Sequence, residues 1–413
     1  KLKKFDFSNL LTTDGEEVRI LDFGKHNFDS GPDFFHAKIQ IGDTVWAGNV
    51  AIHVFSSDRL QHKHKNDLAY NHVILHVVYE EDVKIKSQAG LNIPAIELKS
   101  RIAKKDLKNY KLLRFNQNKI ACENLLQNVS SLSKINAIEK ALTDRLISKS
   151  KKLERILAEK RGDWDEAFYI FLARYFGMKT NSDAFEMLTK SLPYKFILKE
   201  KDDIKKIEAL LFGQAGFLNE KFSDSYPLEL KNEYEHLKNK YNLKPIPVSI
   251  WKFSKLRPLN FPTIRISQLA KILFVQNHLF RNVFECPDLK CLKEIFKIST
   301  TDYWKNHFVF DETSINKQKN LGKTAIEVLI INTIIPALFY FGELNNEQEY
   351  KDKALDFLLK LPKEKNSIIK IWEILDFEVG SAYDSQGLIE LKLNYCDKKK
   401  CLECPVGNEI MNS

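Results

Sequence analysis

Glycine, proline and cysteine are scarce in this chain. Its 413 residues include 15 Gly, 12 Pro and six Cys. The low glycine and proline content excludes a collagen-like chain and argues against a low-complexity or turn-rich all-β chain, so we expect helix to dominate. Six cysteines are too few for a disulfide scaffold in a chain of this length. Four of them stand in close pairs, which favours a reducing compartment and a metal site.

The sequence also lacks a long apolar run and a strong charge excess. Its most apolar stretch, residues 328–341, is interrupted by Asn332 and Pro336 and is shorter than the roughly 20 residues of a membrane span. We therefore expect a buried core helix and no membrane partner. Residues 1–6 carry lysines with no apolar run behind them, so we expect no secretory signal and a cytoplasmic protein. The net charge of +9 favours polyanionic partners without establishing one.

The first hundred residues differ from the remainder of the chain. They hold seven of the ten histidines and most of the segments in which apolar and polar residues alternate, as in strands. Strands are predicted at residues 17–23, 35–41, 44–55, 73–79 and 92–98. From about residue 102 the apolar residues follow helical spacing. Helices are predicted at residues 136–160, 163–177, 204–212, 228–241, 266–280 and 322–341.

One constellation in the first hundred residues carries chemistry. Ser-Gly-Pro-Asp ends at Asp33, and Ala51-Ile52-His53 follows on the third predicted strand. A metal-dependent phosphodiesterase needs a carboxylate at the start of one strand and an acid on the neighbouring strand, so that both bind one Mg²⁺. It also needs a polar group two residues after the second acid. Asp33 and His53 stand at such positions, and Ala51 occupies the place of the second acid.

This order of strands and motifs resembles the PD-(D/E)XK nuclease core. The longer strings Gly-Pro-Asp-Phe, Trp-Ala-Gly-Asn-Val and Val-Ile-Leu-His-Val-Val, with Arg257-Pro-Leu-Asn-Phe-Pro-Thr-Ile-Arg265 and the cysteine tail, resemble the bacterial family called domain of unknown function 2851. The resemblance covers nearly the whole chain. In that family the third strand reads Gly-Asn-Val-Glu-Ile-His, which implies glutamate at position 51. We hypothesise that Ala51 is an inactivating substitution, either engineered or natural.

The nuclease resemblance implies roles for these residues. Asp33, residue 51 and the Ile52 carbonyl would bind Mg²⁺ or Mn²⁺, and His53 would orient or deprotonate water, since its ordinary pKa lies near neutrality. A second hypothesis uses His62, His64 and Asp67 as the zinc or iron site of a hydrolase. A third is a non-catalytic nucleic-acid-binding protein that keeps the nuclease fold.

The C-terminal cysteines predict a structural metal site. Cys396, Cys401 and Cys404 follow one another with spacings of four and two residues, and a Cys-x2-Cys pair folds a knuckle around one tetrahedral metal. The fourth ligand is open between Cys122, a histidine and the pair Cys286 and Cys291. Zinc, an iron–sulfur cluster and buried thiols without metal all remain open.

Basic side chains are candidates for phosphate contacts. They are Lys151 and Lys152 on a predicted helix, Arg257 and Arg265 around a two-proline turn, and His62 and His64. Solvated lysines, and arginines paired with buried carboxylates, are the alternatives. No helix-turn-helix or zinc-finger array is visible, so we expect recognition of shape, with branched or flapped DNA favoured over RNA. A homodimer is left open.

We therefore predict an α+β protein. A restriction-endonuclease-like mixed-sheet domain at residues 1–105 precedes a mainly α-helical domain at 106–395, and a cysteine-rich tail at 396–413 packs on the helical domain. The predicted function is that of a Mg²⁺-dependent endonuclease, inactive in this chain because of Ala51.

Overall fold

The protein consists of two compact units. The structure is a computed structural model that describes residues 4–27, 29–61, 68–87 and 90–413. The sheet unit comprises residues 1–133 and 396–413, and the helical unit comprises residues 134–395. The predicted α+β class, with a mixed sheet followed by a helical region, is confirmed.

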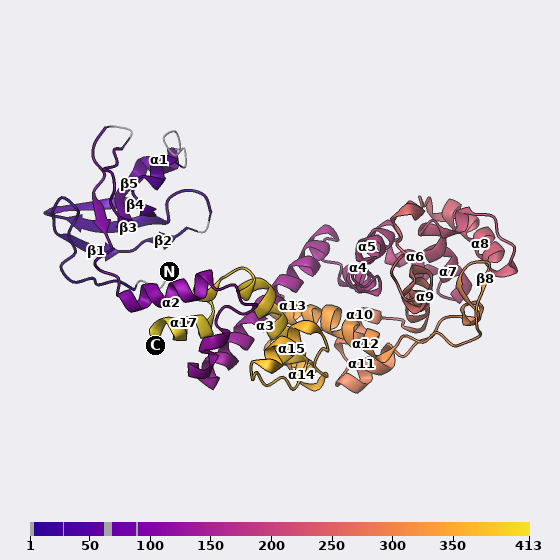
Figure 1. Ribbon diagram of the computed structural model, residues 1–413. Coiled ribbons are helices and arrows are strands. Elements are labelled where there is room, and N and C mark those ends of the chain that lie inside the picture. Colours follow the sequence, from indigo (N-terminus) through magenta and orange to yellow (C-terminus); the bar gives the residue numbers. More distant parts are fainter. Residues whose placement is uncertain (1–3, 28, 62–67, 88–89) are drawn as a thin grey trace. The chain divides into compact units, whose positions relative to one another are not determined.

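The sheet unit is built on one six-stranded mixed sheet (Figure 1). Its strands are β1 (Val18–Asp22), β2 (Lys25–His26), β3 (Phe34–Ile41), β4 (Thr44–Phe55), β5 (Val73–Glu80) and β6 (Ala95–Glu97). The strand order is β1-β3-β4-β5-β6, and β2 pairs with β3. β1, β3 and β4 are antiparallel, whereas β5 lies parallel to β4 and β6 lies parallel to β5.

Both faces of the sheet carry buried apolar side chains. The alternation of β3 places Ala37, Ile39 and Ile41 in one cluster, where they join Val50 and Leu75. A separate, smaller cluster contains Ala51, Tyr70, Val73, Ile85 and Ile93. Residues 50 and 51 therefore belong to different clusters, as strand geometry requires for neighbouring positions.

Short helices and the C-terminal tail complete the sheet unit. They are α1 (Asp58–Gln61), η2 (Leu68–His72), α2 (Lys104–Phe115), η3 (Glu123–Asn128), η10 (Cys401–Glu403) and α17 (Pro405–Asn412). α17 packs against α2, where the Asn109 side-chain amide donates to the Ile410 carbonyl at 2.9 Å. It also contacts η3, and beyond η3 the Ser130 hydroxyl donates to Glu409 at 2.8 Å.

The division into units differs from the expected domain boundaries. The tail at 396–413 packs on α2 and η3, which lie within the residues that we assigned to the helical domain. The structure groups these two helices with the sheet, so the first unit extends to residue 133. Sequence periodicity identifies a helix but not the element against which it packs, which is why the boundary was placed near the last strand.

The helical unit contains most of the helices. They are α3 (Ser131–Glu159), α4 (Trp164–Phe176), α5 (Ser182–Ser191), α6 (Tyr194–Lys199), α7 (Ile204–Gln214), η4 (Phe217–Asn219), α8 (Ser225–Tyr241), η5 (Val248–Ile250), η6 (Pro258–Asn260), α9 (Pro262–Val275), α10 (Leu279–Phe284), α11 (Leu289–Ile295), η7 (Asp302–Lys305), α12 (Lys323–Leu329), η8 (Ile330–Ile334), α13 (Ile335–Leu344), α14 (Gln348–Lys360), α15 (Ser367–Ile374), α16 (Ala382–Glu390) and η9 (Leu391–Cys396). A short hairpin pairs β7 (His307–Val309) with β8 (Glu312–Thr313).

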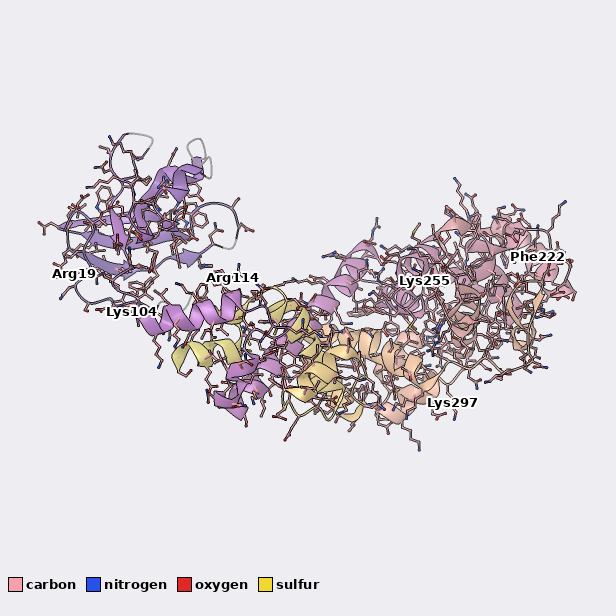
Figure 2. The ribbon with its side chains drawn as sticks, viewed as in Figure 1. Arg19, Lys104, Arg114, Phe222, Lys255 and Lys297 are labelled. Atoms are coloured by element: carbon pink, nitrogen blue, oxygen red, sulfur yellow. A yellow bond between two sulfur atoms is a disulfide. The ribbon has the colours of Figure 1, made fainter. Side chains whose placement is uncertain are left out.

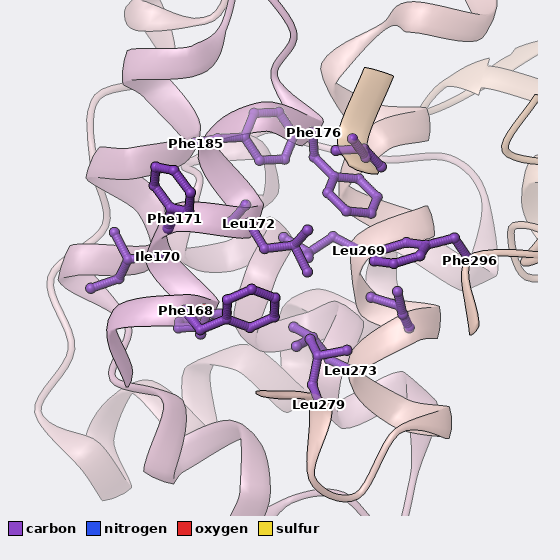
Figure 3. Packing of buried hydrophobic residues seen from close by; sticks show 14 of the residues in the cluster. Phe168, Ile170, Phe171, Leu172, Phe176, Phe185, Leu269, Leu273, Leu279 and Phe296 are labelled. Atoms are coloured by element: carbon purple, nitrogen blue, oxygen red, sulfur yellow. The ribbon is translucent and has the colours of Figure 1, made fainter. Parts of the chain in front are cut away.

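The core of the helical unit is rich in aromatic side chains. Figure 3 shows Phe168 and Phe176 of α4 near Leu269 and Leu273 of α9. All four are fully buried in one large cluster. The predicted helix at 163–177 is confirmed as α4, which Asp163 caps by accepting from the Glu166 amide at 3.1 Å and which ends before Gly177.

The predicted helix at residues 266–280 differs from the observed one. α9 begins at Pro262 and ends at Val275, and α10 starts separately at Leu279. A proline is tolerated in the first turn of a helix because its missing N–H would have no partner there. The Pro262 ring therefore begins α9 rather than preceding it.

One helical stretch is apolar and long enough to cross a membrane by length and composition alone. It runs from Lys323 to Leu344 through α12, η8 and α13, and 61% of its most apolar window is buried inside the protein. Ile330, Ile334 and Leu338 are fully buried in the helical cluster. The stretch is therefore a core helix, as predicted from residues 328–341.

Candidate functional site

Asp33 lies directly before β3, at the end of a segment whose backbone bonds to Asn27. The Asn27 side-chain amide donates to the carbonyl oxygens of Asp29, Ser30 and Pro32 at 3.0–3.2 Å. Gly31 has a φ of 111°, a backbone conformation that residues with a side chain rarely adopt. These local contacts hold the backbone that precedes Asp33, in addition to the contact that Asp33 makes with β4.

Asp33 reaches across to β4 beside position 51. Its Oδ2 accepts a hydrogen bond from the Ile52 amide at 2.7 Å. Phe34 pairs with Val50 in the antiparallel β3–β4 ladder, so the preceding residue Asp33 lies next to Ala51. The structure thus brings together two of the predicted site positions that are 18 residues apart in the sequence.

Ala51 is completely enclosed. Its exposed fraction is 0%, and it packs with Tyr70 and Val73 in the smaller apolar cluster. In the parallel β4–β5 ladder it pairs with His76. Any larger side chain at position 51 would therefore extend toward this histidine and the cluster around it.

His53 contacts a buried histidine. Its Nδ1 lies 2.8 Å from His76 Nε2, with the two rings at 79°. Burial, and then the nearby His53 and Arg59, lower the pKa of His76 to about 3, so His76 is neutral at pH 7. His53 is therefore held in orientation by a neutral imidazole on the adjacent strand.

Arg59 adds a buried cation to this cluster. It is 9% exposed, and its guanidinium lies 5.6 Å from the centre of the Tyr70 ring. Burial lowers the pKa of Arg59, and Nη1 has no hydrogen-bond partner among the described residues. An arginine in such surroundings ordinarily has a carboxylate beside it.

The end of β4 is anchored by Asp82. Its carboxylate accepts from the Ser56 hydroxyl at 2.7 Å and from the Ser57 hydroxyl at 2.6 Å. These bonds lower the pKa of Asp82 to about 2. Asp58 Oδ2 accepts from the Phe55 amide at 2.9 Å and begins α1, which carries Arg59.

The alternative zinc or iron site was predicted at three residues that the structure does not describe. His62, His64 and Asp67 fall outside the described residues. Within the described ranges, no group of three or more His, Cys, Asp or Glu side chains is arranged to hold a metal ion. At Asp33 the donor set does not fit Mg²⁺, because position 51 supplies no carboxylate.

Three of the four predicted cysteine ligands are neighbours in the sheet unit. Burial and the adjacent Cys404 and Cys401 raise the pKa of Cys122 to about 12. Cys396 ends η9, and the Lys399 amide donates to its carbonyl at 3.1 Å. The metal at these thiols stays a prediction, which metal analysis of the purified protein would test.

Cys286 and Cys291 form a disulfide with each other in the helical unit. Asp288, between them, caps α11 by accepting from the Cys291 amide at 2.8 Å. A thiol in a disulfide cannot act as a metal ligand. This pair is therefore no longer a candidate for the fourth ligand.

The predicted phosphate-binding residues of the helical unit differ in their surroundings. Lys151 and Arg257 are exposed, and Lys152 pairs with Glu186 at 2.9 Å. Arg265 is 5% exposed and donates to the amide oxygens of Gln268 and Asn260. Because its guanidinium is enclosed, we leave Arg265 out of the proposed nucleic-acid surface.

Sequence reasoning missed three residues of the site. Asn27 and Arg59 lie in polar segments that carry no distinctive pattern. His76 did carry a signal, because it interrupts an almost continuous apolar strand. A single polar residue in a buried strand requires a partner, and here that partner is His53.

These features define an α+β protein whose mixed sheet gathers a carboxylate and two histidines around one strand, followed by a helical unit. The chain belongs to the family described as protein of unknown function (DUF2851), whose model matches residues 1–367. No curated protein and no solved structure matches the chain.

Proposed function

We propose that the sheet unit is a metal-dependent nuclease unit of the PD-(D/E)XK type, selective for branched or flapped DNA. In this chain Ala51 stands where the second metal-binding acid belongs. The chain as it stands then binds nucleic acid without hydrolysing it, and restoring an acid at position 51 completes the Mg²⁺ site.

One observation carries this proposal, namely the approach of the Asp33 carboxylate to β4 beside Ala51. Arg59 is a buried cation, His76 is a neutral imidazole next to Ala51 in the ladder, and Asp33 approaches from β3. A carboxylate at position 51 would place a second acid beside Asp33. Two carboxylates and His53 are the groups that metal-assisted phosphodiester hydrolysis requires.

The test is the variant Ala51→Glu, assayed with Mg²⁺ and with Mn²⁺ on single-stranded, duplex, flapped and four-way-junction DNA and on RNA. We expect cleavage by A51E and none by the chain with Ala51. A51Q is the matched control, because it adds the same volume without charge. A51E/D33N, which removes the first carboxylate, is expected to be inactive.

A readout without catalysis separates the metal site from the reaction. We expect Mn²⁺ to raise the melting temperature of A51E but not that of A51Q, since a ligand that binds only the folded state stabilises it. If A51E folds, and neither binds Mn²⁺ nor cleaves any substrate, the nuclease proposal is wrong.

The non-catalytic alternative is favoured by one observation, the tight packing of Ala51. Its complete burial next to Tyr70 and Val73 leaves little room for a longer side chain. On this alternative, A51E would be destabilised and DNA binding by the original chain would persist. Activity that requires bound zinc and survives D33N would instead support the hydrolase hypothesis.

A further inference from the structure

The positive charge of the sheet unit is concentrated on α2. Residues 1–98 carry 11 Lys and Arg against 14 Asp and Glu. By contrast, the 12 residues of α2 contain four lysines and one arginine against a single acid, Asp106. The Lys4 ammonium lies 3.4 Å from the Asp106 carboxylate and neutralises it. Outside α2, the whole sheet unit carries 17 Lys and Arg against 18 Asp and Glu, so α2 is a cationic element on an otherwise nearly neutral unit.

The lysines of α2 have no counter-charge in the described part of the chain. No carboxylate there lies within 4.0 Å of Lys104, Lys105, Lys108 or Lys111, and all four side chains are exposed. Leu113 is the buried residue of the helix, and Asn109 bonds to the tail. One side of α2 therefore docks on α17, and the other side faces solvent.

The solvent side of α2 is a groove in which basic and apolar side chains alternate. A groove of about 750 Å³ is lined by Lys104, Leu107, Lys108, Lys111, Leu112, Phe115 and Asn116. Phe115 is 68% exposed. An aromatic ring with this exposure, one helical turn from the Lys111 ammonium, offers a stacking surface next to positive charge.

The C-terminal tail extends the same surface. Lys399 and Lys400 line a second cavity together with Tyr110 and Arg114, and the Lys399 ammonium donates to the Asn116 carbonyl at 2.6 Å. Lys104 and Arg114 mark the two ends of α2 in Figure 2. The fold thus joins cationic segments that are almost 300 residues apart.

We infer that this α2 surface, formed by the groove residues of α2 with Tyr110, Arg114, Lys399 and Lys400, binds a single strand of nucleic acid. Ammonium groups along a groove follow the phosphate backbone, and exposed aromatic rings stack on unpaired bases. The bases of a duplex are stacked on each other, so Phe115 contributes only where the strand is unpaired.

The arrangement favours a nucleic acid over a membrane surface. A helix that lies in a membrane interface separates its charged and apolar side chains onto opposite faces. On α2 the lysines and the apolar side chains line the same groove. An acidic protein partner would use the lysines but has no need of the exposed ring.

This inference deepens the proposed function and rests on it for the class of substrate. It names the unpaired strand of a flapped or branched DNA as the part that the sheet unit holds. The inference concerns binding in the absence of divalent metal, so it can fail while metal-dependent cleavage by A51E succeeds, and the reverse also holds.

The test is fluorescence anisotropy of the full chain with a labelled 20-nucleotide single strand in EDTA at several salt concentrations. For K104Q/K108Q/K111Q we expect an affinity at least about tenfold weaker. The slope of log affinity against log salt should be shallower by about 2, since each lost single-strand phosphate contact removes about 0.7. The matched control is K205Q/K238Q/K360Q, which removes the same charge from lysines paired with carboxylates on the helical unit.

A second pair of variants isolates stacking. F115L keeps an apolar side chain but loses the ring, and we expect affinity for the single strand to fall about fivefold or more, with no change for a duplex. F115W is expected to bind like the original chain. The inference is overturned if the triple-lysine variant and its control weaken binding equally, or if F115L binds as well as F115W. It is also overturned if vesicles containing phosphatidylserine compete with the strand on equal terms.

Discussion

The two units treat buried charge differently. In the helical unit, Glu208 is completely buried, and its carboxylate accepts hydrogen bonds from Tyr226, Ser267 and Thr301. Lys319 is 1% exposed, and its ammonium donates to the Trp304 carbonyl at 2.5 Å. Here the burial of a charged group is offset by oxygen or hydroxyl partners.

In the sheet unit, a buried arginine and a buried histidine each have a nitrogen atom without such a partner in the described part of the chain. Arg59 Nη1 and His76 Nδ1 lack hydrogen-bond partners among the described residues. An unpartnered buried group costs about 1–3 kcal/mol, and more if it is charged. The helical unit also contains such atoms among its described residues, for example Arg265 Nε and Thr300 Oγ1, so unpartnered atoms alone do not mark either unit as the functional one.

The largest expected effect tests the packing of the helical unit. Phe168 is fully buried, whereas Phe115 of the sheet unit is 68% exposed. We expect F168A to reduce the free energy of unfolding by about 3–5 kcal/mol, because it leaves a cavity, and F115A to change it by less than about 0.5 kcal/mol. Urea denaturation followed by circular dichroism measures both. Equal losses would contradict the assigned burial.

Glu208 is expected to make the helical unit less stable as the pH rises. Burial raises the pKa of Glu208 to about 7, so between pH 4.5 and 7 the folded state holds a proton that the unfolded state has released. Stability should fall by about 3 kcal/mol across this window. Urea denaturation at several pH values should show a flatter profile for E208Q, and hydrogen exchange should locate the change at α7. An unchanged profile in E208Q would contradict the prediction.

His76 is expected to have the opposite effect in the sheet unit. Its pKa is lowered to about 3. Below pH 6.5 the His76 imidazole therefore binds a proton in the unfolded state but stays neutral in the folded state. Stability should therefore fall by about 2 kcal/mol between pH 6.5 and pH 5. Hydrogen exchange of β5 peptides measures this loss, and H76Q should abolish it. Equal acid sensitivity of H76Q and the original chain would refute the assignment.

The smallest expected effect compares two arginines. Arg174 of the helical unit donates to both Asp183 and Glu186 at 2.6 Å, so R174M should cost about 1 kcal/mol. Arg59 has no such partner among the described residues, so R59M should leave stability unchanged or raise it by up to about 1 kcal/mol. Thermal unfolding of both variants measures the difference. A larger loss for R59M would show that Arg59 is already paired.

Much of the local structure could be predicted from the sequence. The strands at 44–55 and 73–79 and the helix at 163–177 agree with β4, β5 and α4 to within one residue at each end. Alternation and helical spacing are properties of neighbouring residues, so they report which face of an element is buried. Asp33, Ala51 and His53 could be chosen as candidate site positions because their motif resembles the PD-(D/E)XK core, and a spacing of two places Ala51 and His53 on the same face of β4.

The partners of those residues could not be predicted. The contact of Asp33 with the Ile52 amide, and that of His53 with His76, depend on strand pairing. The Arg59 cation reaches His76 from α1, a short helix with no sequence signature. Which strands pair is decided by the burial of the whole sheet, and no local pattern encodes it.

The sequence by itself determined the class of the fold and most of its elements, because these follow from short-range periodicity and residue type, and it named candidate site positions. Only the tertiary structure decided that His76, whose pKa the Arg59 cation helps to lower, pairs with Ala51 in the sheet, and that Lys399 and Lys400 join α2. Such contacts join residues far apart in the chain. They form only where the free energy gained by burial exceeds the conformational entropy lost in bringing the segments together.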